Sequence, residues 1–385
     1  MRVFLIAGEP SGDKLGAALM AGLKELAPDV VFDGIGGTQM AAQGLVSRFP
    51  MEELSVMGIA EILPKYRALK RRIRETAQSV IETAPDVLIT IDAPDFSFRV
   101  ARLVKAGSRV RTVHYVAPTV WAWRPGRAAK IAGFIDHLLT LLPFEPPYFT
   151  RHGMACDFVG HPVVAEPVPT DTDILAFRHT HKIGDAPLML VLPGSREGEV
   201  RRLTEDFGDA VHRALAEHPQ MRVIVPAAAP VAAFVKDAVK QWPVDALVLD
   251  PNGLSPEEGN RQKCAAFYAA DVALAASGTV SVELAAARTP MVIAYRMNWL
   301  SFRLIRAMTL VDTVTLVNLV SETRSVPEFL GPECRPDTIA AALCQTIESP
   351  GAQLAAMDLT MTRLGRGADA PGLRAARAVL NRMPD

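Results

Sequence analysis

The 385-residue chain contains few cysteines, and none of them lies in a pattern typical of a metal site or a disulfide framework. Cys156, Cys264, Cys334 and Cys344 stand far apart without a CxxC spacing, which is typical of a protein kept in a reducing cytoplasm. An excess of one charge is also missing, because 41 Lys and Arg residues stand against 42 Asp and Glu residues. A chain this balanced gives no indication of a nucleic-acid partner.

Long hydrophobic runs are absent as well. The longest apolar stretch, Val223 to Val235, is interrupted by two prolines and is shorter than the roughly 20 residues that span a bilayer. No signal peptide is expected, because Gly-Glu-Pro follows the first apolar residues at once. Any membrane contact is therefore expected to be peripheral. With 49% hydrophobic and 22% charged residues, the chain is expected to fold into two or three compact domains.

Strand patterns alternate with helical patterns along the whole chain. Continuous apolar runs such as VFLIAG and DVLITID are typical of buried parallel strands, and the alternation restarts with LMLVLPGSRE after a proline-rich segment. This order predicts an α/β protein with two doubly wound, Rossmann-like parallel-sheet domains that face a cleft. Helices are expected at about 15–26, 59–83, 96–106 and 280–288. The expected boundaries are a first domain at 1–165, a linker at 166–186, a second domain at 187–336 and C-terminal helices at 337–385.

Two strand-ending turns in the second domain have the composition of anion-binding sites. The segment SGTVSVELAAA places Ser277, Gly278 and Thr279 between a buried strand and a helix, with Glu283 one turn into that helix. Backbone N–H groups at such a turn can bind phosphate, and a carboxylate there can accept hydrogen bonds from both ribose hydroxyls. The alternative is an ordinary helix cap followed by a surface glutamate.

The other turn, PGSREGEV, offers the guanidinium group of Arg196 to a diphosphate. Its alternative is a solvated loop arginine. Because both turns follow strands of one predicted sheet, together they favour a diphosphate-bearing ligand in the second domain.

The first domain carries a carboxylate at a strand end. Asp92 of TIDAPDF ends a buried strand and faces the predicted cleft as a candidate general base, the alternative being a turn aspartate. Asp95 follows a proline and is expected to stabilise the start of the next helix. The loop AGEPSGD lacks the GxGxxG spacing of a dinucleotide site, and its Ser11, Gly12 and Asp13 are candidate acceptor-binding residues.

Two segments combine apolar and basic residues. In ILPKYRALKRRIR the apolar residues fall at helical spacing beside six cations and no acid, which is typical of a helix on an anionic membrane surface. An ordinary helix with a solvated face is the alternative. NWLSFRLIRAMTL is the second such segment. The residues expected at this membrane or acyl-binding surface are Ile62, Leu63, Tyr66, Leu69, Lys70, Arg71, Arg72, Trp299 and Phe302.

No metal site is expected. Asp171 and Asp173 match a DxD pattern, but they lie in the proline-rich segment instead of following a strand, so helix capping is the better interpretation. No set of histidines, cysteines and carboxylates has the spacing of metal ligands.

Seven motifs, in order, resemble those of the lipid-A-disaccharide synthases. They are AGEPSGD, MEELSVMGIAEIL, IDAPDF, VHYVAPTVWAWRPGRAAKI, LPGSREGEV, SGTVSVELAAARTPMVIAYRMN and PEFL, and they extend from about Ile6 to Arg335. The resemblance implies the GT-B fold and transfer of 2,3-diacylglucosamine from UDP-2,3-diacylglucosamine to the 6-hydroxyl of 2,3-diacylglucosamine 1-phosphate (lipid X). The implied products are the β-1,6-linked lipid A disaccharide 1-phosphate and UDP, formed by an inverting, metal-independent reaction.

The resemblance also implies roles for single residues. Asp92 is the implied base, Arg196 and the Ser277–Thr279 turn stabilise the leaving UDP, Glu283 holds the ribose, and Asn318 lines the donor site. No cofactor is implied. Members of the family work at the cytoplasmic face of the inner membrane, and some form a homodimer.

Two other functions compete with this one. A UDP-sugar 2-epimerase of the same fold needs no acyl-binding surface, and the two apolar and basic segments argue against it. A non-catalytic peripheral membrane-binding protein needs neither Arg196 nor the SGT turn with Glu283.

Overall fold

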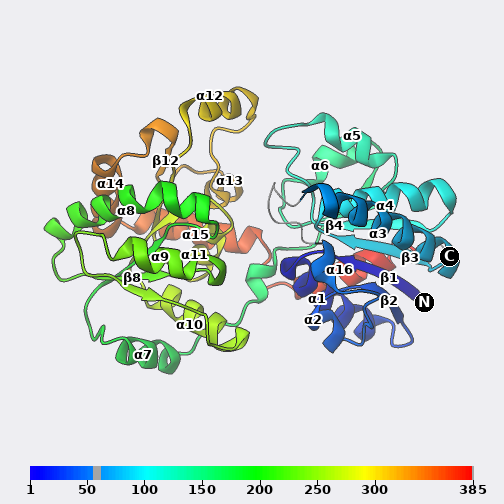
Figure 1. Cartoon of the computed structure of the whole chain (residues 1–385), viewed down its shortest axis with the longest axis horizontal. Helices are drawn as coiled ribbons and strands as arrows, with labels where there is room; N and C mark the ends of the chain where they lie inside the picture. Colours follow the sequence, from blue (N-terminus) through cyan, green and yellow to red (C-terminus); the bar gives the residue numbers. More distant parts are fainter. Residues whose placement is uncertain (55–61, 384–385) are drawn as a thin grey trace. The chain divides into compact units, whose positions relative to one another are not determined.

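The computed structural model describes residues 1–54 and 62–383, and for 62–66, 300, 301 and 305 it describes the backbone alone. These residues form two compact units, each an α/β domain on a six-stranded parallel sheet (Figure 1). Unit 1 comprises Met1–Ala165 with Leu364–Asp385, and unit 2 comprises Glu166–Arg363. The prediction of two doubly wound α/β domains is confirmed.

Unit 1 alternates strands with helices from its first residues. Its strands are β1 (Arg2–Ala7), β2 (Val31–Ile35), β3 (Val87–Ile91), β4 (Arg111–Tyr115), β5 (His137–Thr140) and β6 (Ala155–Phe158). Its helices are α1 (Pro10–Leu26), α2 (Thr38–Ala42), η1 (Met51–Leu54), α3 (Ile62–Thr83), α4 (Pro94–Gly107), α5 (Gly126–Ala132), α6 (Pro146–Thr150), η3 (Pro162–Ala165) and α16 (Pro371–Leu380). The sheet order is β2-β1-β3-β4-β5-β6.

Unit 2 repeats the same plan. Its strands are β7 (Leu188–Leu192), β8 (Arg222–Pro226), β9 (Leu247–Leu249), β10 (Val272–Ala276), β11 (Met291–Tyr295) and β12 (Glu328–Leu330). Its helices are α7 (Asp171–Thr180), α8 (Glu197–Glu217), η4 (Ala229–Val231), α9 (Ala232–Val239), α10 (Pro256–Ala269), α11 (Val280–Ala286), α12 (Trp299–Met308), α13 (Leu316–Ser321), η5 (Gly331–Glu333), α14 (Pro336–Glu348) and α15 (Gly351–Arg363). The sheet order is β12-β11-β10-β7-β8-β9.

The apolar runs become strands that are buried on both faces. Every residue of β3, β7 and β10 is buried, as expected for parallel strands covered by helices on each side. The covering helices contribute one apolar stripe each. In α8, Leu203, Phe207 and Val211 recur every fourth residue and pack into the core of unit 2.

The C-terminal helix α16 belongs to unit 1, although unit 2 precedes it in the chain. Figure 1 shows this red helix beside the blue α1, and Ala375, Ala376 and Val379 share a core cluster with β1. Gly22 on α1 makes the close crossing feasible, because a Cβ atom there would lie 2.8 Å from the backbone oxygen of Gly372. The C-terminal helices therefore belong to two different units, whereas the sequence predicted one C-terminal segment at 337–385.

The predicted linker at 166–186 contains the helix α7 and lies within unit 2. A capping box begins α7, since Thr170 Oγ1 accepts from the N–H of Asp173 and the Asp173 carboxylate accepts from the N–H of Thr170. The capping interpretation of the DxD pattern is therefore confirmed.

A buried carboxyl group anchors the loop that follows β4. Glu145 is 3% exposed, and it accepts hydrogen bonds from the Trp121 indole N–H at 3.1 Å and the Leu142 backbone N–H at 3.0 Å. Burial is the largest influence and raises the pKa of Glu145 to about 7, although both hydrogen bonds act in the opposite direction.

Candidate active site

The order of strands in unit 2 marks where a ligand should bind. From β7 the chain proceeds outward through β8 and β9, and it then returns to the other side of β7 with β10. The carboxyl ends of β7 and β10 therefore flank the point at which the sheet reverses direction, where open α/β sheets bind their ligands. The turns that follow these two strands are 193–196 and 277–279, the two anion-type turns of the sequence.

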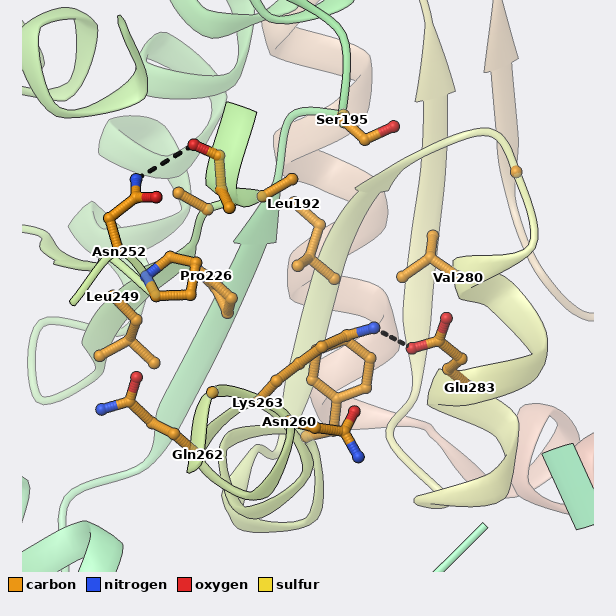
Figure 2. Close-up of a pocket in the computed structure, with 18 of the residues that line it drawn as sticks. Leu192, Ser195, Pro226, Leu249, Asn252, Asn260, Gln262, Lys263, Val280 and Glu283 are labelled. Carbon is orange, nitrogen blue, oxygen red and sulfur yellow. Dashed lines mark hydrogen bonds and ion pairs between the residues drawn. The ribbon is translucent and has the colours of Figure 1, made fainter. Parts of the chain in front are cut away.

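A cavity of about 890 Å³ opens at this point and lies wholly within unit 2 (Figure 2). Its walls come from the turns after β7, β8, β9 and β10 and from one face each of α10 and α11. The structure brings the two predicted turns and Glu283 to this one cavity. Its lining includes Gly194, Ser195, Arg196, Asn252, Asn260, Gln262, Lys263, Ser277, Gly278, Thr279 and Glu283.

The turn after β7 has a conformation that requires glycine. Gly194 has a φ of +117°, and a Cβ atom there would lie 2.8 Å from Oε2 of Glu199. The same Glu199 oxygen accepts a hydrogen bond from the backbone N–H of Ser195 at 3.3 Å. Glu199 thus fixes the turn from the first part of α8.

Arg196 occupies the N-cap position of α8 and has an accessible guanidinium group. Its side chain is 82% exposed, and its contact with Glu199 Oε1 is 3.3 Å long. An exposed ion pair of this kind contributes little to stability. The guanidinium group therefore remains available to an anion in the cavity, beside the positive end of α8.

The turn after β10 carries Ser277 and Gly278, with Thr279 at the N-cap of α11. Its Thr279 makes no side-chain capping hydrogen bond, and a Cβ atom at Gly278 would meet open space. Glu283 follows in the first turn of α11, and its carboxylate forms an ion pair with the ammonium group of Lys263. Figure 2 shows these two side chains pointing toward each other.

Several lining residues were not found by the sequence analysis. Lys263 lies on α10, whose sequence has no turn signal at that point. Asn252 belongs to the loop after β9, and its side-chain amide donates to the backbone oxygen of Ala229 at 3.1 Å. The turn-rich sequence DPNGLSPEE was an available signal for this loop, because it follows a strand of the same sheet.

Asn318 does not line the cavity. It is 1% exposed, and its amide is engaged with Val326, donating to the backbone oxygen at 2.9 Å and accepting from the N–H at 3.0 Å. A further hydrogen bond joins Asn318 to Thr313 at 3.3 Å. These hydrogen bonds give Asn318 a structural role, and the donor-site role implied by the resemblance stays a prediction.

In unit 1 the sheet reverses direction between β1 and β3, and Asp92 immediately follows β3. Asp92 is half-buried with a φ of +50°, and its backbone N–H donates to Tyr115 at 3.0 Å. Within residues 1–54 and 62–383, no donor is hydrogen-bonded to its carboxylate. A Cβ atom at Gly8 would lie 2.8 Å from Cβ of Ala93, so the segments after β1 and β3 touch.

Asp95 lies in the first turn of α4 as predicted, but it does not occupy the N-cap position. Ala93 holds the N-cap position in a left-handed conformation without a side-chain cap, and Asp95 is exposed in the first turn. Its carboxylate therefore acts on the free N–H groups through the helix dipole alone.

The predicted acceptor loop is helical. Ser11, Gly12 and Asp13 lie in the first turn of α1, which begins at Pro10 and not near residue 15. Asp13 is 3% exposed, and its carboxylate accepts from three backbone N–H groups of α2 and its cap at 2.8, 2.9 and 3.0 Å. Gly12 is buried against β1 and β3. Of the three residues, Ser11 alone is exposed, so the structure assigns structural roles to Gly12 and Asp13.

Two arginines of the basic segment on α3 pair with glutamates of the same unit, which the sequence pattern did not indicate. Arg72 makes hydrogen bonds of 2.8 and 3.0 Å with both carboxylate oxygens of Glu53, and Arg71 lies 3.6 Å from Glu75. Leu69 is half-buried against a core cluster of unit 1 and does not face outward, whereas Lys70 is exposed. The side chains of Ile62, Leu63 and Tyr66 lie outside the described residues.

The second apolar segment remains exposed in unit 2. Trp299, Leu304 and Leu310 are 60%, 61% and 61% exposed. The guanidinium group of Arg303 stacks 5.2 Å from the Trp299 ring centre. Phe302 is half-buried, because its ring packs against Gly331.

Among residues 1–54 and 62–383, no helix is long and apolar enough to cross a membrane. No group of three or more His, Cys, Asp or Glu residues in the described ranges is arranged to hold a metal ion.

Solved structures with a similar fold come from enzymes that act on UDP-sugars and from glycosyltransferases. The UDP-GlcNAc 2-epimerase of Neisseria meningitidis, solved with UDP-GlcNAc, matches with a TM-score of 0.65 at 11% identity, covering 99% of both chains. A glycosyltransferase of Rickettsia africae matches with a TM-score of 0.57 at 8% identity, covering 99% of this chain and 98% of its own. These likenesses establish the GT-B fold and no activity.

Sequence relatives are far closer. A family model described as lipid-A-disaccharide synthetase matches residues 3–368. The lipid-A-disaccharide synthase of Ruegeria pomeroyi is 64% identical over 384 residues, covering 100% of this chain and 96% of the relative. That of Rhodospirillum centenum is 49% identical over 385 residues, covering 98% and 94%. The chain therefore belongs to the lipid-A-disaccharide synthase family, and the epimerase alternative is not favoured.

Proposed function

We propose that this enzyme transfers 2,3-diacylglucosamine from UDP-2,3-diacylglucosamine to the 6-hydroxyl of lipid X and releases UDP. Membership of the lipid-A-disaccharide synthase family supports the reaction. The observation that carries the proposal is the cavity of unit 2, where Arg196, the Ser277–Thr279 turn and Glu283 line one space at the reversal point of the sheet.

The donor UDP-sugar is bound through its negatively charged diphosphate. Arg196 neutralises charge on the diphosphate, and the backbone N–H groups of the Ser277–Thr279 turn add hydrogen bonds. These contacts strengthen as the sugar–phosphate bond breaks and negative charge develops on UDP, so they stabilise the transition state more than the bound donor. Glu283 accepts hydrogen bonds from the ribose hydroxyls. The proposal needs no cofactor.

The acceptor end uses Asp92 as general base. The oxygen of the acceptor 6-hydroxyl attacks the anomeric carbon of the donor while the bond from that carbon to the diphosphate oxygen breaks. The hydroxyl proton passes to the Asp92 carboxylate, and the electron pair leaves with UDP. Attack opposite the leaving group inverts the anomeric configuration and yields the β linkage. The accessible carboxylate at a strand end supports this role, and exposed Ser11 remains a candidate acceptor contact.

The acylated substrates lie in a membrane, and we propose that the enzyme binds the cytoplasmic face of the inner membrane peripherally. Exposed Trp299, Leu304 and Leu310 supply an apolar surface, with Arg303 beside them. Apolar side chains flanked by cations favour an anionic bilayer surface. Lys70 and Arg71 are exposed and are further candidates for contacts with lipid headgroups, whereas Arg72 is hydrogen-bonded to Glu53.

Incubation of the pure protein with UDP-2,3-diacylglucosamine and lipid X, followed by mass spectrometry, tests the reaction. We expect a disaccharide 1-phosphate and UDP in equal amounts, and NMR of the product should show a β-1,6 linkage. An epimerised UDP-sugar without any disaccharide would instead support the epimerase function. Neither product would refute both.

A further inference from the structure

Lys263 enters the donor cavity from α10, opposite the helix that carries Glu283 (Figure 2). Gly259, Lys263 and Phe267 recur every fourth residue, which places them on one face of α10, and all three line the cavity. A capping box at Ser255 and Glu258, with bonds of 2.9 and 3.2 Å, fixes the start of this helix. Lys263 is thus mounted on a well-anchored element.

The ammonium group of Lys263 is held from two sides. It forms an ion pair with Oε2 of Glu283, and it lies 5.2 Å from the centre of the Phe267 ring. The Lys263 and Glu283 side chains are 43% and 37% exposed, so both remain open to the cavity. In Figure 2 the second oxygen of Glu283 points away from Lys263.

This arrangement leaves part of the Glu283 carboxylate unused. An ionised carboxylate offers about four lone-pair positions, and the single contact with Lys263 leaves most of them for hydroxyl donors. A half-exposed glutamate without a partner would populate several rotamers, and ordering it would cost binding free energy. Lys263 therefore restricts Glu283 before a ligand arrives.

The pair also has an electrostatic role. Glu283 is an anion in the same cavity as the turns proposed to bind a diphosphate, and two like charges repel each other in a partly desolvated site. The ammonium group of Lys263 offsets the Glu283 charge. The cavity can then hold a carboxylate for a ribose without repelling the phosphates.

We propose that Lys263 is a positioning residue, which holds Glu283 in place for the ribose and thereby sets the preference of the donor site for ribonucleotides. The inference rests on the proposed function, because it takes Glu283 as the ribose ligand. It extends that function to a residue outside the strand-ending turns.

Titration calorimetry with UDP and with 2′,3′-dideoxy-UDP tests the inference, because the second nucleotide has no ribose hydroxyl for Glu283. Lys263→Met keeps the length of the side chain and removes its charge. We expect this variant to lose roughly tenfold in UDP affinity beyond any loss for dideoxy-UDP, as for a weakened hydrogen bond to a charged group. Lys263→Arg should restore most of the preference.

Lys236→Met is the matched control. Lys236 pairs with Asp250 at 3.6 Å on the same unit, is 54% exposed and does not line the cavity. This control variant should bind both nucleotides as the unmodified protein does. A Lys263→Met variant that melts normally and keeps the full preference for UDP overturns the inference, and so does an equal loss for both nucleotides. Failure of the unmodified protein to bind UDP would instead overturn the proposed function itself.

Discussion

Replacing Asp92 with asparagine removes the proposed proton acceptor and is expected to leave the fold intact. Asparagine has nearly the same size and adopts left-handed backbone angles readily, so it tolerates the φ of +50° at this position. Both hydrogen bonds of the Asp92 backbone also survive. Its N–H donates to the backbone oxygen of Tyr115 at 3.0 Å, and its carbonyl oxygen accepts from Ser97 Oγ at 2.8 Å. Alanine is the poorer choice, because a left-handed alanine adds roughly 1–2 kcal/mol of strain.

An asparagine amide cannot accept the acceptor's hydroxyl proton. Loss of a general base slows reactions by roughly 100-fold to 10,000-fold, which corresponds to about 3–5 kcal/mol in the activation free energy. The melting temperature should change by no more than about 2 °C, since no buried contact is lost. The affinity for UDP should not change, because the donor cavity lies wholly within unit 2 and Asp92 lies in unit 1.

Turnover is measured under saturating donor and acceptor in mixed micelles, with thermal melting and UDP calorimetry on the same preparations. Asp95→Asn is the matched control, because Asp95 lies three residues away, is exposed and acts only near the start of α4. This control should retain most of the activity. Near-normal turnover in Asp92→Asn, or a folded but inactive Asp95→Asn, would show that the assignment of the base is wrong.

Four other predictions follow from the same structure. Arg196→Ala should weaken UDP binding by about 1.5–3 kcal/mol in calorimetry and leave the melting temperature unchanged, since this guanidinium group is 82% exposed. Unchanged UDP affinity would contradict its role. Asp13→Ala should lower the free energy of unfolding by about 3 kcal/mol in urea titrations, because three backbone N–H groups lose their acceptor, while the exposed Asp29→Ala should have little effect. Glu145 has a pKa of about 7 when folded, against 4.5 for an ordinary glutamate, so the folded state binds the extra proton and stability should fall as pH rises from about 4.5 to 7. Glu145→Gln should remove that part of the slope in urea titrations at several pH values, and an unaltered slope would exclude Glu145 as its source. Binding to anionic vesicles in sedimentation assays should weaken as salt rises and should decrease in Trp299→Ser, and salt-independent recovery in the supernatant would argue against a membrane surface here.

The sequence by itself determined the fold class. Continuous apolar runs such as Leu188–Leu192 and Val272–Ala276 are buried on both faces, and only a parallel sheet covered by helices on each side accommodates a series of such strands. The same reasoning placed Arg196 and Ser277 at one edge of one sheet, because the carboxyl ends of parallel strands lie together. Their ligands, and the role of Asp92, stay predictions.

Only the tertiary structure decided which polar side chains are available. Asp13, Asn318 and Arg72 have the same chemistry as binding residues, but Asp13 is bound to backbone N–H groups of α2, Asn318 to Val326 and Arg72 to Glu53. Each partner lies on another element, and local sequence patterns do not encode which elements meet.

Helical periodicity shows a similar limit. The pattern of α3 distinguished an apolar from a basic face, but it did not show that the apolar Leu69 packs into the core of its own unit. No local sequence signal marks Lys263 on α10. It became part of the candidate site only because α10 and α11 both line the cavity. The assignment of α16 to unit 1 also depends on a contact between distant elements. Gly22 on α1 leaves room for α16 to cross closely, and its local sequence does not show that α16 will lie there. Periodicity in a sequence fixes which residues share a face, whereas contacts between distant elements decide what that face touches.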